Sequence, residues 1–170
     1  RGDIVIHGNV ESGVNIRATG SITIDGVAEA CMLEAGKDII LRGGMLGGNK
    51  ASVKTKGAIT AKFFEFTNIL CEGDLQADVL MDCSVICHGQ IRLTGRKGSI
   101  IGGKVQAIRG LIATSLGNDA EKRTEIFVGA GIDVYSRLRV MEKKIETTRE
   151  ELAKIEEGLE KFEILSKERG

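Results

Sequence analysis

The segment from Gly98 to Val105 reads GSIIGGKV and nearly matches a phosphate-binding loop. In such a loop, glycines let backbone N–H groups face the phosphate and the lysine reaches its oxygens. Val105 stands where a magnesium-binding Ser or Thr is required, and the flanking residues indicate strands. A related run from Gly43 to Lys50 occurs one large repeat earlier. Because the run repeats, we interpret both copies as structural turns.

Cysteines offer a second possible chemistry, since Cys83, Cys87 and His88, with Cys71 nearby, are residue types that zinc accepts. In the repeat described below, however, Cys71 and Cys87 share a position with small residues, namely Ala18, Ala35 and Thr55. We therefore interpret the cysteines as small buried side chains with free thiols. We predict no metal site, no cofactor and, in a reducing compartment, no disulfide.

Parallel β-solenoids also include carbohydrate-cleaving enzymes and acyltransferases. Sugar-cleaving sites use paired carboxylates, usually with aromatic platforms for the sugar rings, but this chain has no Trp and one Tyr. A hexapeptide acyltransferase has strict six-residue periodicity, whereas the repeats here vary in length. We predict a protein that is not an enzyme, with no catalytic residues.

Three of the five phenylalanines, Phe63, Phe64 and Phe66, fall within four positions. Strand alternation does not turn all three inward. They either cap the core locally or present at least one ring to a partner. We assign Phe64 and Phe66 as candidate partner-binding residues.

The elements that would position these residues come from a repeat. Short alternating apolar stretches follow glycines at positions 2, 20, 36, 57, 73, 89 and 110, with steps of 16 to 21 residues. A 53-residue period is nested inside, as from Gly20 to Gly73. Equivalent positions carry side chains of similar size, so parallel rungs would stack like on like. Residues 1–128 are predicted to form an all-β solenoid, that is, a parallel β-helix, with glycines at tight corners.

A different period begins at Arg137. Apolar residues then recur at three- and four-residue steps, which is the a/d pattern of a coiled coil. We predict a connector over 129–136 and a C-terminal coiled-coil α-helix over 137–170, the truncated first arm of a helical hairpin. Its apolar seam needs a partner helix. The candidate partner-binding residues on this seam are Leu138, Ile145, Leu152, Ile155, Leu159 and Phe162.

The charges name no partner. Lys plus Arg total 24 and Asp plus Glu total 24, so no net field attracts nucleic acid or an acidic membrane. No apolar run is long enough for a membrane span, and no signal peptide opens the sequence. We expect protein partners, no nucleic acid, no direct membrane insertion and a cytoplasmic location. Because the chain starts at Arg1 with the strand pattern already running, we expect a fragment of a longer protein.

Several runs in order resemble the flagellar assembly protein A family of bacteria. They are Gly36–Ile40, Gly43–Lys50, Ala58–Phe63, Lys97–Gly103 and Thr124–Gly129. The resemblance covers nearly the whole chain and implies a right-handed solenoid placed before a long helical hairpin. The solenoid is similar to those of the division inhibitor MinC and the bactofilins, which associate into dimers or polymers. The resemblance implies no catalytic residues.

We therefore expect a non-enzymatic scaffold or adaptor, acting in flagellar assembly or polar organisation and recruited to a cell pole or flagellar base. It would work through protein contacts and self-association by its helix and solenoid. The alternative is a self-assembling, bactofilin-like cytoskeletal element. An enzyme of the carbohydrate-active or acyltransferase type comes third.

Overall fold

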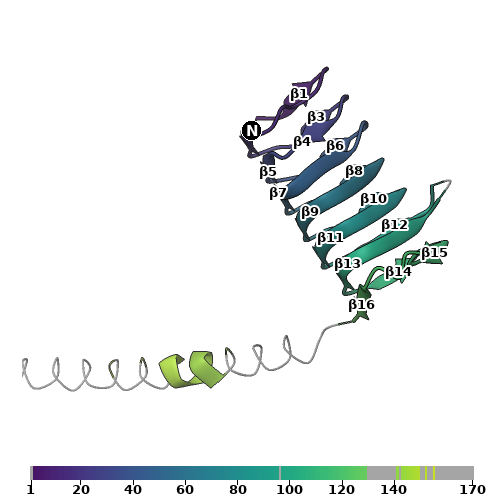
Figure 1. Cartoon of the computed structure of the whole chain (residues 1–170). Helices are drawn as coiled ribbons and strands as arrows, with labels where there is room; N and C mark the ends of the chain where they lie inside the picture. Colours follow the sequence, from purple (N-terminus) through teal and green to yellow (C-terminus); the bar gives the residue numbers. More distant parts are fainter. Residues whose placement is uncertain are drawn as a thin grey trace, which may run out of the picture. The chain divides into compact units, whose positions relative to one another are not determined.

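The computed structural model describes residues 2–95, 97–129, 141, 143–149, 152 and 155. The chain divides into two compact units, Arg1–Gly129 and Ala130–Gly170. The first unit is the all-β solenoid that the sequence predicts. It has about seven turns, whose rungs follow one another in chain order from purple to green in Figure 1.

Two parallel sheets make up the solenoid, and neighbours within each are successive rungs. The first sheet runs in the order β1 (Ile4–Ile6), β3 (Ile22–Ile24), β6 (Ile39–Leu41), β8 (Ile59–Ala61), β10 (Leu75–Ala77), β12 (Gln90–Leu93) and β14 (Gly110–Ile112). The second runs in the order β2 (Asn15–Ala18), β5 (Met32–Ala35), β7 (Met45–Thr55), β9 (Phe63–Cys71), β11 (Val79–Cys87), β13 (Ser99–Ala107) and β15 (Ser115–Leu116). In addition, β16 (Thr124–Val128) pairs with β13 and β4 (Ala28–Glu29) pairs with β7.

The long strands of the second sheet bend in the middle. Phe66 in β9, Asp82 in β11 and Gly102 in β13 occupy the same register position, with φ of 45°, 49° and 70°. A left-handed residue turns the chain sharply, so each of these strands contributes two sides of the rung. We call the first sheet side 1, the segments before the bend side 2 and the segments after it side 3.

Inward-facing columns form the core. Side 3 stacks Leu33, Val53, Ile69, Val85 and Val105 in register. Side 1 stacks Ile22, Ile39, Ile59, Leu75 and Ile91 in the same way. All ten side chains are buried. The predicted strand alternation and like-on-like stacking are confirmed, and each such side chain contributes roughly 1.5–3 kcal/mol relative to exposure.

Close packing between rungs requires glycine at one corner of the solenoid. A Cβ added to Gly73 would lie 2.6 Å from the carbonyl oxygen of Gly57, and Gly89 is packed against Gly73 in the same manner. Neither Gly73 nor Gly89 has a left-handed φ, so lack of space excludes a side chain there. The predicted placement of Gly110 in this column is wrong by one residue. Gly110 pairs with Gln90, and the Arg109 N–H binds the Gly89 carbonyl.

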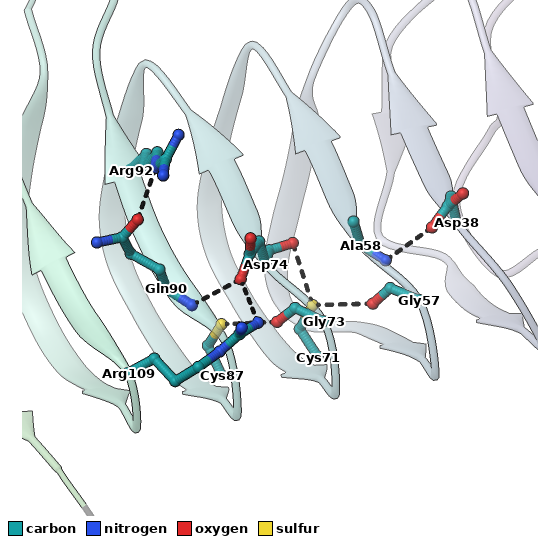
Figure 2. A network of polar contacts seen from close by, with 10 residues as sticks. All are labelled: Asp38, Gly57, Ala58, Cys71, Gly73, Asp74, Cys87, Gln90, Arg92 and Arg109. Carbon is teal, nitrogen blue, oxygen red and sulfur yellow. Dashed lines mark hydrogen bonds and ion pairs between the residues drawn. The ribbon is translucent and has the colours of Figure 1, made fainter.

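Aspartates beside this corner tie neighbouring rungs together. Asp38 Oδ1 accepts the Ala58 N–H at 2.8 Å, and Asp74 Oδ1 accepts the Gln90 N–H at 2.9 Å (Figure 2). Asp74 Oδ1 also lies 2.7 Å from Arg109 Nη2. Each carboxylate therefore satisfies a backbone donor that the turn leaves outside the sheet ladder.

Helical residues are described in the second unit at 141, 143–149, 152 and 155. The hydroxyls of Thr147 and Thr148 donate to the carbonyls of Lys143 and Lys144, one helical turn earlier, at 2.9 Å. A coiled coil stays a prediction. Among the described residues, the chain forms no helix with the length and apolar character that a bilayer crossing needs.

Candidate protein-interaction surfaces

Most of each double-glycine run lies in a strand, with Gly43 and Gly44 just before β7 and Gly98 just before β13. Ser99 to Val105 belongs to β13, which pairs in register with β11 and is followed in the chain by another strand, β14. The Gly102 N–H donates to Thr124 Oγ1 at 2.9 Å, and a Cβ on Gly103 would collide with the backbone of Cys83. The earlier copy forms an irregularity in β7, where the register shifts between Leu46 and Ala51. These backbone groups serve rung packing, so the phosphate-binding alternative has no support here.

All four cysteines are buried free thiols. Cys71 and Cys87 are register partners, and their thiols donate to the carbonyls of Gly57 and Gly73 at 3.3 and 3.2 Å (Figure 2). Burial raises the pKa of the Cys83 thiol to about 11. The interpretation of these residues as small buried side chains is confirmed. Within the part of the chain that the structure describes, no three His, Cys, Asp or Glu side chains gather around a potential metal position.

The assignment of Phe64 to a partner-binding surface is wrong. Phe64 is completely buried, in a side 2 column between Met45 and Leu80. Because side chains alternate along β9, Phe64 points inward while its two neighbours point outward. Phe66 sits at the left-handed bend and is half-buried, with Lys122 Nζ 5.7 Å from the centre of its ring.

Outward-facing residues of side 2 form an apolar groove that the sequence reading missed. Phe63 and Val79 are register partners, and Met81 lies between Glu65 and Ile101 in the next outward column. The Phe63 ring lies over Gly44, where a Cβ would meet the ring at 2.5 Å. The groove encloses about 350 Å³. The side chains that line this groove, which we call the side 2 groove, are those of Lys62, Phe63, Glu65, Asp78, Val79, Met81 and Lys97.

Outward positions on side 3 change character along the rod. One column carries Arg17, Glu34, Lys54, Leu70, Ile86, Gln106 and Phe127 in successive rungs. Glu34 pairs with Arg17 at 3.1 Å and with Lys54 at 3.9 Å. Further along, Ile86 is 44% and Phe127 47% exposed. The column is therefore charged in its first three rungs and largely apolar thereafter.

The helical residues of the second unit include three of the predicted seam positions. Ile145, Leu152 and Ile155 are 54%, 57% and 62% exposed. The other three, Leu138, Leu159 and Phe162, lie outside the described residues. Whether this seam binds a partner stays a prediction.

The chain matches the family described as Flagellar Assembly Protein A beta solenoid domain over residues 1–170. The chain belongs to this family. The resemblance seen in the sequence is thereby confirmed, and the family description relates this solenoid to flagellar assembly. No curated protein matches the chain, and no solved structure does.

The missed groove had a weak signal in the sequence. Val79, Met81 and Ile101 are apolar at positions that alternation assigns to the outer face. Finding them required the correct bend position. The bend at Asp82 shifts the alternation, so Leu80 and Cys83 both point inward although they are three positions apart, an odd spacing that regular alternation would place on opposite faces.

Proposed function

We propose that this domain is a non-catalytic protein-binding scaffold in flagellar assembly, and that its side 2 groove receives an apolar side chain of a partner protein. The observation that carries the proposal is the groove itself. Half-buried apolar side chains from two successive rungs, Phe63 in β9 and Val79 and Met81 in β11, line it on the outer face.

The stacked rungs support such a role. Side chains on adjacent parallel strands lie about 4.8 Å apart, so the register of the sheet fixes the spacing of the groove walls. Because the inward columns are packed in the same rungs, the groove is held in shape before a partner arrives. Preorganisation of this kind lowers the entropic cost of binding.

Charged residues at the edge of the side 2 groove would orient a bound partner. Lys62 and Lys97 line the groove together with Glu65 and Asp78. Apolar contacts flanked by charges of both signs are typical of protein interfaces, where the centre supplies affinity and the rim selects the register. The cytoplasmic location near a flagellar base is part of this proposal.

The test compares two matched substitutions in the full chain. Val79→Glu places a carboxylate in the groove, whereas Ile40→Glu places one at a half-buried outward position on side 1. We expect the first variant to lose capture of a flagellar protein from lysate, identified by mass spectrometry, and the second to keep it. Circular dichroism should show both folded.

Strains carrying these alleles extend the test. Fewer flagella per cell are expected with Val79→Glu and normal numbers with Ile40→Glu. Equal capture and equal flagellation in both strains would contradict the proposed groove. Concentration-dependent growth of the wild-type chain into long polymers in sedimentation would favour the bactofilin-like alternative.

A further inference from the structure

Side 3 has an outward face whose two ends are chemically complementary. The face comprises seven rungs in the order β2, β5, β7, β9, β11, β13 and β16, so β9 is its centre. Its charged side chains on β2, β5 and β7 are Arg17, Glu34 and Lys54, and those on β13 and β16 are Lys104 and Glu125. The central strand β9 and its neighbour β11 present outward residues without charge: Asn68, Leu70, Ser84 and Ile86.

We propose that this face binds the same face of a second copy of the chain, related by a two-fold axis that runs parallel to the strands over β9. This rotation reverses the order of the rungs. It places β2 over the partner's β16, β5 over its β13 and β7 over its β11, while β9 lies over itself. The inference deepens the proposed scaffold role by naming one partner, a second copy.

Charge supports this geometry. Arg17 on β2 would face Phe127 on the β16 of the second copy, because the two share a column, and Glu125 lies two residues away on the same strand. A guanidinium is attracted by both a carboxylate and an aromatic face. Glu34 on β5 would face β13, which carries Lys104. Both outer strand pairs therefore bring an anion near a cation, and the contact would exchange pairs that form within one copy, Arg17 with Glu34 and Glu125 with Arg123. Lys104 Nζ lies 5.2 Å from the centre of the Phe127 ring in the same copy, so Arg17 would share this end of the face with a second cation.

The centre of the face supports it as well. Leu70 on β9 would meet its own copy, and Ile86 on β11 would lie against the aliphatic stem of Lys54. The ends also fit in shape, because a hollow of about 440 Å³ lies over β2, β5 and β7, lined by residues that include Arg17, Met32 and Lys54. The exposed Ile86 and Phe127 side chains would enter it from the second copy.

A second isologous arrangement is disfavoured by the same charges. A two-fold axis along the rod would keep the rung order and place Arg17 near Arg17 of the copy, and Glu34 near Glu34. Like charges opposed across an interface suppress pairing. The charge pattern thus selects the antiparallel arrangement of the two rods.

The size of the face predicts a weak dimer. Seven strands spaced 4.8 Å apart, each contributing about four residues, cover about 400 Å². Interfaces below the standard size are transient, so we expect a concentration-dependent dimer with a Kd in about the micromolar range.

Cross-linking at the axis tests the position of the contact. Asn68 lies on β9, where the two copies would meet, and Gln76 is an exposed residue of β10 on side 1. The native thiols are buried and should not compete. With a bismaleimide reagent, Asn68→Cys should form covalent dimers about tenfold faster than Gln76→Cys. Both variants carry Leu152→Lys and Ile155→Lys, which removes pairing through the exposed helical residues.

Charge exchange tests the geometry in the same background. Sedimentation should show that Arg17→Glu or Glu125→Arg alone weakens self-association about tenfold, and that the two together restore it. Equal cross-linking at both positions, a monomer at all concentrations, or no restoration in the double variant would overturn the proposal. A monomer that still captures a flagellar protein through the side 2 groove would leave the proposed function intact.

Discussion

The inner and outer columns of side 3 come from the same strands, yet the inner column keeps similar residue types from rung to rung and the outer column does not. Inside, five successive rungs place Leu33, Val53, Ile69, Val85 and Val105 at one position. Outside, one residue further along the chain, the column changes from charged at Glu34 to aliphatic at Ile86. The inner column must match its neighbours in volume, because every rung completes the core of the next.

The outer column is free of that constraint. An exposed side chain contributes little to folding, so its chemistry can vary along the rod without cost to the core. Stability is therefore distributed evenly along the inner columns, while binding properties are local to particular outer positions. The same substitution at an inward-facing and at an outward-facing position of the solenoid strands tests this difference.

The largest effect is expected from Ile69→Asp. An unpaired carboxylate would replace a buried side chain between Val53 and Val85 and should lower the free energy of unfolding by about 3–5 kcal/mol. The control is Ile86→Asp, the same substitution at a 44% exposed outward position, expected to cost under about 1 kcal/mol. Urea unfolding followed by circular dichroism measures both, and equal losses would break the distinction between inner and outer columns.

A pH effect comes next, from the buried Cys83 thiol. Its folded pKa is raised to about 11 from an ordinary value of 9.0. The folded state thus keeps the proton that the unfolded state loses, so the thiol's full stability contribution is present below about pH 9 and disappears as pH rises through 11. Two pKa units correspond to about 2–3 kcal/mol.

Chemical unfolding of wild type and Cys83→Ala at pH 8 and at pH 11 measures this contribution. The difference in unfolding free energy between the two pH values should be smaller in the variant. An identical pH dependence in both proteins would show that the thiol does not titrate as burial predicts.

Corner packing gives a third comparison, between two glycines. Gly73→Ala would press a Cβ against the Gly57 backbone and should destabilise the solenoid by about 1–3 kcal/mol. Gly8 has open space around its Cβ position and no left-handed φ, so Gly8→Ala should leave stability unchanged or slightly raised. Thermal melts report both. A tolerated Gly73→Ala would mean that the rungs are further apart than described.

The smallest effect is expected at the exposed end of the inter-rung network. Asp74→Ala removes the acceptor of the Gln90 N–H and the partner of Arg109, and should cost about 0.5–1.5 kcal/mol (Figure 2). Asp74→Asn keeps an acceptor oxygen and should lose less. If Asn is as destabilising as Ala, the charge on Asp74 matters more than its hydrogen bond to the rung.

Much of the solenoid could be predicted because its core is periodic. The alternation at Ile22 and Ile24, or at Leu75 and Ala77, assigns the inner face directly, and stacking at equal positions follows from the repeat. The candidate site could not be predicted to the same extent. The aromatic side chain of Phe64 is of a type that is common at interfaces, yet it lies in the core. Only its place in the strand alternation before the bend at Phe66 shows which of the two applies.

The sequence by itself determined the class of fold and the columns that fill it, since a two-residue period and a recurring rung are local properties. Tertiary structure decided the outer surface. A left-handed residue at Asp82 resets which side chains face outward, and register brings Phe63, Val79 and Met81 into one groove from residues up to 18 positions apart. Which side chains meet in the groove depends on the number of residues in each turn. One residue more or less in a turn moves every following side chain of the strand to the opposite face.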